Sequence, residues 1–140
     1  MQLSRKLSLA LLLMMISVAA IAKNVKPAHL YMFGFSASFK DSTVYITDIQ
    51  DVAGAWIDSK TGFLIGRDGY SQQMRNYLAT KHQQPERVCV VVYATSLKKA
   101  EKKYRKFQRI YVEKGKSSYV VHPLTSTDFS FTPEAVSEAE

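Results

Sequence analysis

Residues 87–94 read RVCVVVYA, and residues 96–115 read SLKKAEKKYRKFQRIYVEKG. The first stretch is a continuous apolar run rich in β-branched side chains, which is typical of a strand covered on both faces. The second carries an apolar residue at every third or fourth position, the spacing of one side of an α-helix. These positions are Leu97, Ala100, Tyr104, Phe107 and Tyr111. We therefore predict a strand at the centre of a sheet, followed by a helix that packs on that sheet.

Both ends of this helix carry residues suited to them. The Ser96 hydroxyl can cap the N-terminus, and Gly115 can adopt the left-handed conformation that ends a helix. Residues 119–124, YVVHPL, then have the composition of another strand. Residues 87–124 therefore predict a β-α-β unit with parallel strands and a right-handed crossover.

The preceding part of the chain predicts a hairpin and a loop. Residues 29–39 are rich in aromatic and small side chains, and residues 43–52 begin with alternating apolar and polar positions. The short polar turn between them is typical of a β-hairpin. Residues 53–69 contain several glycines and no sustained periodicity, so we predict a loop with one short strand at residues 63–65.

A second helix is predicted after this loop, with Ser71 as its cap. Its apolar side is expected to comprise Tyr70, Met74, Tyr77 and Leu78. The element order is then strand, strand, helix, strand, helix, strand. This order predicts an α+β two-layer sandwich, with a mixed four-stranded sheet and both helices on one face. The domain is expected to span residues 23–131, followed by a disordered acidic tail at residues 132–140.

The first 22 residues have the pattern of a secretory signal peptide. Arg5 and Lys6 precede an uncharged apolar run, residues 7–22, which ends in the small-residue sequence AIA. We expect cleavage after Ala22 and an exported protein, periplasmic or extracellular. The alternative is a transmembrane anchor, but this run has 16 residues and a bilayer core requires about 20.

The chain is basic and has a single cysteine. Its 140 residues include 19 Lys and Arg against 12 Asp and Glu, a net charge of +7. Cleavage would remove Arg5 and Lys6, so that 17 basic residues face 12 acidic ones. A basic balance favours anionic partners. Cys89 cannot form an intramolecular disulfide, and its apolar neighbours predict a buried thiol.

The outer side of the helix at residues 96–114 is predicted to be basic. With successive residues about 100° apart, six cations lie opposite the apolar stripe: Lys98, Lys99, Lys102, Arg105, Lys106 and Arg109. Like charges four residues apart cost about 0.2–0.5 kcal/mol per pair in an isolated helix. Because a solubilising face would mix signs, we interpret this band as a surface for lipid headgroups, an acidic polymer or another envelope protein, with nucleic acid disfavoured by export. The alternative is a solvated face paired with Glu134, Glu138 and Glu140 of the tail.

No catalytic or cofactor-binding motif is found, and neither a metal nor a cofactor is predicted. Asp58 and Asp68 lie in the predicted loop, where paired carboxylates can act as acid and base on a sugar, although Asp is also common in turns. Trp56 lies in the same loop and can stack on a ligand or a partner protein. We predict an exported, non-enzymatic binding or accessory protein that uses its basic helix. The alternatives are a small hydrolase and a module that docks through the Trp56 loop.

Overall fold

The computed structural model describes residues 23–113 and 118–136. The predicted signal peptide, residues 1–22, and the predicted helix stop, Gly115, lie outside the described residues. Within the described ranges, no helix is both long enough and apolar enough to cross a membrane.

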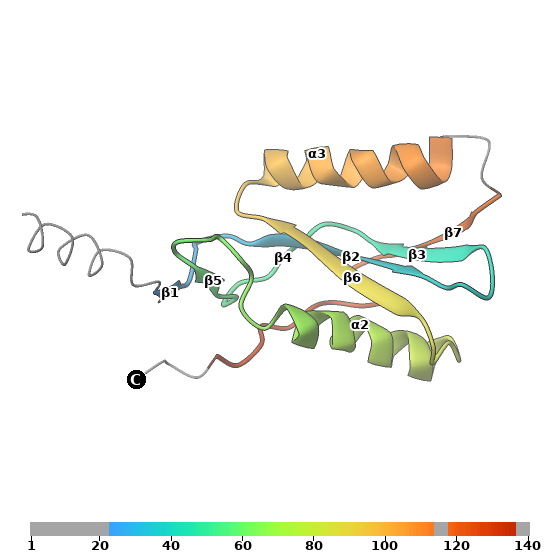
Figure 1. The fold of residues 1–140 in the computed structure, drawn as a ribbon, viewed down its shortest axis with the longest axis horizontal. Helices are drawn as coiled ribbons and strands as arrows, with labels where there is room; N and C mark the ends of the chain where they lie inside the picture. Colours follow the sequence, from blue (N-terminus) through green and yellow to red (C-terminus); the bar gives the residue numbers. More distant parts are fainter. Residues whose placement is uncertain (1–22, 114–117, 137–140) are drawn as a thin grey trace, which may run out of the picture.

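The described residues form a five-stranded sheet, a separate two-stranded sheet and two α-helices (Figure 1). This content confirms the predicted α+β class, and the longer elements follow the predicted order. The elements in chain order are β1 (Asn24–Val25), β2 (Tyr31–Ala37), β3 (Thr43–Thr47), β4 (Gln50–Asp51), β5 (Ile57–Asp58), α2 (Arg67–Lys81), β6 (Val88–Ala94), α3 (Leu97–Gln108), the π-helical turn η1 (Arg109–Glu113) and β7 (Val120–Leu124).

The large sheet is mixed and has β2 in its interior. Strand β2 pairs antiparallel with β6 on one side and with β3 and β4 on the other, while β7 pairs with β3 in parallel. Strands β3 and β4 follow each other along the same side of β2, and the register shifts by one residue between them, at residues 48–49. This shift is a β-bulge. The five strands therefore occupy four positions, in the order β6, β2, β3 with β4, and β7.

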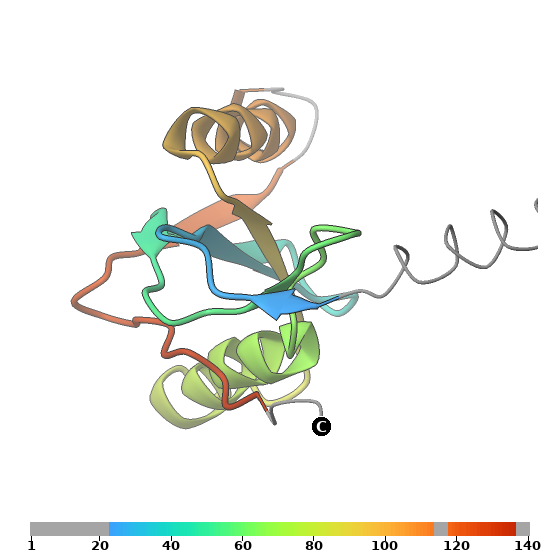
Figure 2. The ribbon, with the colours of Figure 1, turned by 90° about the vertical axis from the view of Figure 1, so that its left-hand side faces the viewer.

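Helices α2 and α3 cover opposite faces of the sheet, which corrects the prediction that both lie on one face (Figures 1 and 2). Met74 of α2 belongs to the same buried cluster as Met32 of β2. Phe107 of α3 packs against the second cluster, which contains Phe33 of β2. Successive residues of a strand point to opposite faces. The domain therefore has three layers, with the sheet between the two helices.

The strand order explains why the helices lie on different faces. The crossover through α2 leads from β3 to β6, and the crossover through α3 returns from β6 to β7, so the two run in opposite directions across the sheet. Crossovers between parallel strands share one handedness. Two crossovers of the same hand that run in opposite directions lie on opposite faces.

Strand β6 lies at an edge of the sheet, whereas the sequence predicts it at the centre. Among the described strands it pairs only with β2, and β7 forms the opposite edge. Cys89 and Val91 are buried on the α2 face, which confirms the predicted buried thiol, and this burial raises the pKa of Cys89. Val88 and Val90 on the α3 face are 48% and 38% exposed. Val92 packs against the cluster beneath α3, so only the first part of β6, at Val88 and Val90, is uncovered on this face.

Helix α2 begins at Arg67, earlier than the predicted cap Ser71. Gly66 precedes it with a φ of 73°, which is the left-handed conformation. Tyr70, Met74 and Leu78 are fully buried, which confirms the predicted apolar side. The missed start follows from Gly66, because a left-handed glycine is more typical of a helix end than of a helix beginning.

We expect Gly66→Ala to lower the free energy of unfolding by about 1–2 kcal/mol, because a Cβ is strained at positive φ. The new Cβ would also lie 3.2 Å from Cβ of Glu134. Gly62 is the matched control, since it has a φ of 72° and open space where its Cβ would be. Urea titration of both alanine variants separates the two effects. A loss for Gly62→Ala as large as that for Gly66→Ala would show that the contact with Glu134 contributes nothing.

The segment after β7 packs along α2. The Thr132 N–H donates to Oε1 of Gln73, and Nε2 of Gln73 donates to the Thr132 carbonyl. The Glu134 N–H donates to Oη of Tyr70. The start of the predicted tail is therefore held on α2, while the final four residues lie outside the described chain.

Candidate functional site: the basic face of helix α3

Helix α3 presents its basic side to solvent because its apolar side is fixed to the sheet. Oγ of Ser96 accepts the Lys99 N–H, which confirms the predicted cap. The rings of Tyr104 and Phe107 pack edge-on against Phe33, with centroid separations of 5.1 and 5.5 Å. These contacts confirm the predicted apolar stripe and set the rotation of the helix about its axis.

The two ends of the stripe differ from its centre. Leu97, in the first turn, is 45% exposed and so departs from the predicted core position. At the other end the α-helix stops at Gln108 and continues as η1, in which Tyr111 still contacts Phe35 at 4.6 Å between ring centroids. A small apolar cavity of about 110 Å³ lies between this end of the helix and strands β3 and β7.

The six predicted basic residues are all solvent-exposed on the outer side of the helix: Lys98, Lys99, Lys102, Arg105, Lys106 and Arg109. Within the described part of the chain, none of their side chains forms an ion pair. Four of them, together with Lys103, line a surface depression of about 420 Å³: Lys99, Lys102, Lys106 and Arg109. The helix thus concentrates positive charge around one shallow hollow.

Among the acidic side chains that the structure describes, Glu101 and Glu134 do not pair with the cations of this face. Glu101 is exposed on α3, yet forms no ion pair with another described residue. Glu134 lies beside α2, on the other side of the sheet, where its carboxylate accepts from Nε2 of Gln73. Glu138 and Glu140 fall outside the described residues. An unneutralised row of cations attracts anions from solution.

The candidate loop residues do not lie beside the basic face of α3. Trp56 is partly buried, with Nζ of Lys26 5.1 Å from the centroid of its ring. The Asp58 carboxylate accepts the Lys60 and Thr61 N–H groups, and these hydrogen bonds lower its pKa. Asp58 therefore stabilises a turn as an anion, which is unsuited to a general acid.

Asp68 lies in the first turn of α2 and lines a groove between α2 and β6. Arg67 and Arg75 line the same groove. The predicted pair of loop carboxylates is therefore divided between a turn next to β5 and a groove beside β6. Nothing in these contacts joins the two as partners in one reaction.

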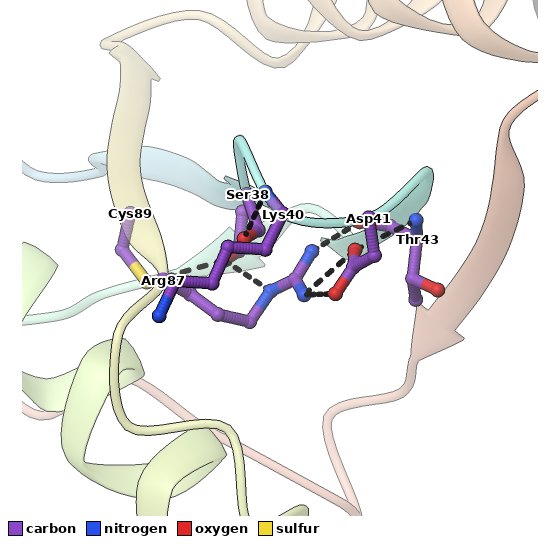
Figure 3. Close-up of polar contacts among 7 residues, drawn as sticks. Ser38, Lys40, Asp41, Thr43, Arg87 and Cys89 are labelled. Atoms are coloured by element: carbon purple, nitrogen blue, oxygen red, sulfur yellow. Dashed lines mark hydrogen bonds and ion pairs between the residues drawn. The ribbon is translucent and has the colours of Figure 1, made fainter.

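The most developed polar cluster surrounds Arg87, which the sequence did not single out (Figure 3). Arg87 is 3% exposed. Its Nε donates to Oγ of Ser36 at 3.2 Å, its Nη1 to the Asp41 carboxylate at 3.3 Å, and its Nη2 to the Thr43 carbonyl. The guanidinium also lies 4.8 Å from the ring centroid of Tyr45. These contacts fasten the start of β6 to the β2–β3 hairpin, so the cluster is structural.

Comparison with known proteins gives no match: no protein-family model, no curated protein and no solved structure is similar to this chain.

Proposed function

We propose that this chain is an exported, non-enzymatic binding protein whose α3 basic face contacts an anionic partner. The observation that carries the proposal is the row of six exposed cations, none of which has an acidic partner among the described residues. Export rests on the sequence pattern of residues 1–22. The proposed partner is an acidic polymer, an anionic lipid surface or another envelope protein.

The packing of α3 favours surface attraction over membrane insertion. Tyr104, Phe107 and Tyr111 pack against the buried cluster of the sheet, so the apolar stripe is not available for insertion into lipid. The hydrolase alternative has less support, since the two loop carboxylates lie in different environments. Docking through the Trp56 loop also has less support, because the Trp56 ring is partly buried and already meets Lys26.

We expect residues 23–140 to bind a polyanion and to lose at least about tenfold in affinity when four cations of α3 are changed to Gln. The test variant changes Lys98, Lys102, Lys106 and Arg109. The control variant removes the same charge elsewhere and changes Lys23, Lys26, Lys60 and Lys81. Binding is measured against heparin, a DNA duplex and vesicles that contain phosphatidylglycerol. Equal weakening by the two variants would reject a dedicated site on α3.

A further inference from the structure

Strand β6 has an outer edge that no other described strand pairs with. It has seven residues, contains no proline and pairs only with β2 among the described strands. The opposite edge is less suited to an added strand, because β7 has five residues and includes Pro123, which has no N–H to donate. Sheet edges that no neighbouring strand covers are the usual sites at which an extended chain joins a sheet.

The outward hydrogen-bonding groups of β6 can be identified from its existing contacts. Nη2 of Arg67 donates to the Val91 carbonyl at 3.0 Å, and Nζ of Lys103 donates to the Tyr93 carbonyl at 2.9 Å. The N–H and C=O of one residue in an antiparallel pair point to the same side. The N–H groups of Val91 and Tyr93 therefore also point away from β2.

The partner of Val91 in β2 supports this assignment. Gly34 lies opposite Val91. Its N–H donates to Oγ1 of Thr47 at 2.9 Å, on the side of β2 away from β6. The Gly34 and Val91 positions therefore form a pair without mutual hydrogen bonds, which leaves the Val91 amide directed to the open edge.

Cations flank this edge on both faces of the sheet. On the α2 face, a groove of about 510 Å³ runs between α2 and β6, and its lining residues are Arg67, Asp68, Ser71, Gln72, Arg75, Cys89 and Val90. On the α3 face, Lys103 reaches the edge itself, beside the hollow that it lines together with Lys99 and Lys106. One acidic side chain, Asp68, lines the groove against two arginines. The edge therefore lies in a positive field on both sides.

We propose that the β6 edge binds an extended acidic segment of a partner polypeptide as an added strand. Alternate side chains of such a strand point to opposite faces, so its carboxylates would meet Arg67 and Arg75 on one face and Lys103 on the other. Arg67 and Lys103 would turn from the carbonyls of β6 to these carboxylates, which frees the carbonyls for the N–H groups of the incoming strand. The inference rests on the proposed function, because the α3 lysines take part, and it names the partner as a polypeptide.

Charge favours an acidic strand over a second copy of the chain as the partner of the β6 edge. Pairing of β6 with β6 of another molecule would place two arginine-lined grooves and two rows of lysines side by side, and the repulsion between like charges opposes that arrangement. An acidic strand is instead attracted from both faces.

The probe is a fluorescein-labelled peptide of eight residues that repeats Glu-Glu-Val-Val, which places carboxylates on both faces of an extended strand. It is compared with a version N-methylated at alternate amides. N-methylation retains the charge but removes the hydrogen bonds of one edge. We expect the parent peptide to bind at least about tenfold more tightly than the methylated one, because each methylated amide has no N–H to donate to a carbonyl of β6. We also expect it to slow hydrogen exchange at Val91 and Tyr93. Arg75→Gln and Lys103→Gln should weaken binding, whereas Lys81→Gln, at the far end of α2, should not.

Three results would overturn the inference. Equal affinity for the two peptides would show attraction to charge without strand addition, and the proposed function would stand. Binding of heparin without binding of either peptide would likewise reject strand addition and leave the proposed function standing. Protection of the β6 amides at micromolar concentration without peptide, together with a dimer in sedimentation, would assign the edge to a second copy. Failure of every polyanion to bind would instead reject the proposed function itself.

Discussion

Arg87→Met is expected to lower the free energy of unfolding by about 3 kcal/mol, because it removes one partner of a buried ionic network. The substitution keeps most of the side-chain volume, so loss of polar contacts dominates. Oγ of Ser36 and the Thr43 carbonyl lose a charged donor at a place that water hardly reaches, and the Asp41 carboxylate loses its cation. Urea denaturation followed by circular dichroism measures the change.

Substitutions at two neighbouring residues, Asp41 and Lys40, give reference values for the loss of stability in Arg87→Met. Asp41→Asn should cost less, because the Asp41 side chain is 41% exposed and water replaces part of the interaction. Lys40→Gln removes the exposed ion pair between the hairpin and Glu86, the residue before Arg87, and should leave stability nearly unchanged. If Arg87→Met costs no more than Lys40→Gln, Arg87 does not fasten β6 to the hairpin.

Phe33→Ala is expected to cost about 3–5 kcal/mol, the usual range for a fully buried phenylalanine. The Phe33 ring is 0% exposed and lies between the sheet and α3, in contact with Tyr104 and Phe107. Its removal leaves a cavity directly beneath the helix. We therefore expect amide exchange in α3 to accelerate more than exchange in α2, as measured by mass spectrometry.

Phe63→Ala is the matched control, since Phe63 is 68% exposed. A surface truncation of this kind should change stability by no more than about 0.5 kcal/mol. If exchange in α2 and α3 accelerates equally after Phe33→Ala, α3 does not depend on this ring for its own attachment. The basic face would then be held by the rest of the stripe.

Much of the fold is predictable from local patterns. The three-and-four spacing of apolar residues located both helices, and the β-branched run at residues 88–94 located β6. Its position at the edge was not predictable, because Val88 and Val90 are as apolar as a buried strand requires but lie beyond the cover of α3. Strand order and the face of each helix arise from tertiary pairing, which local spacing does not encode.

The candidate site was also predictable from the sequence only in part. The six cations of α3 were identified from helical periodicity, and their exposure follows from the docking of the opposite side. The groove beside β6 was not foreseen, because Arg67 and Arg75 are distant in sequence from Lys103 and meet it only across the sheet edge. Arg87 was missed because a charge directly before an apolar strand is usually a flanking surface residue.

The most direct test of the central claim is the salt dependence of binding to a DNA duplex, used as a polyanion of known charge density. Each phosphate contact contributes a slope of about −0.9 in log K against log salt concentration. We predict that changing Lys98, Lys102, Lys106 and Arg109 to Gln removes about three to four units of slope, one contact for each lost cation. The control with Lys23, Lys26, Lys60 and Lys81 changed should keep the parent slope. A slope that is the same in all three proteins would contradict a binding role for the basic face of α3.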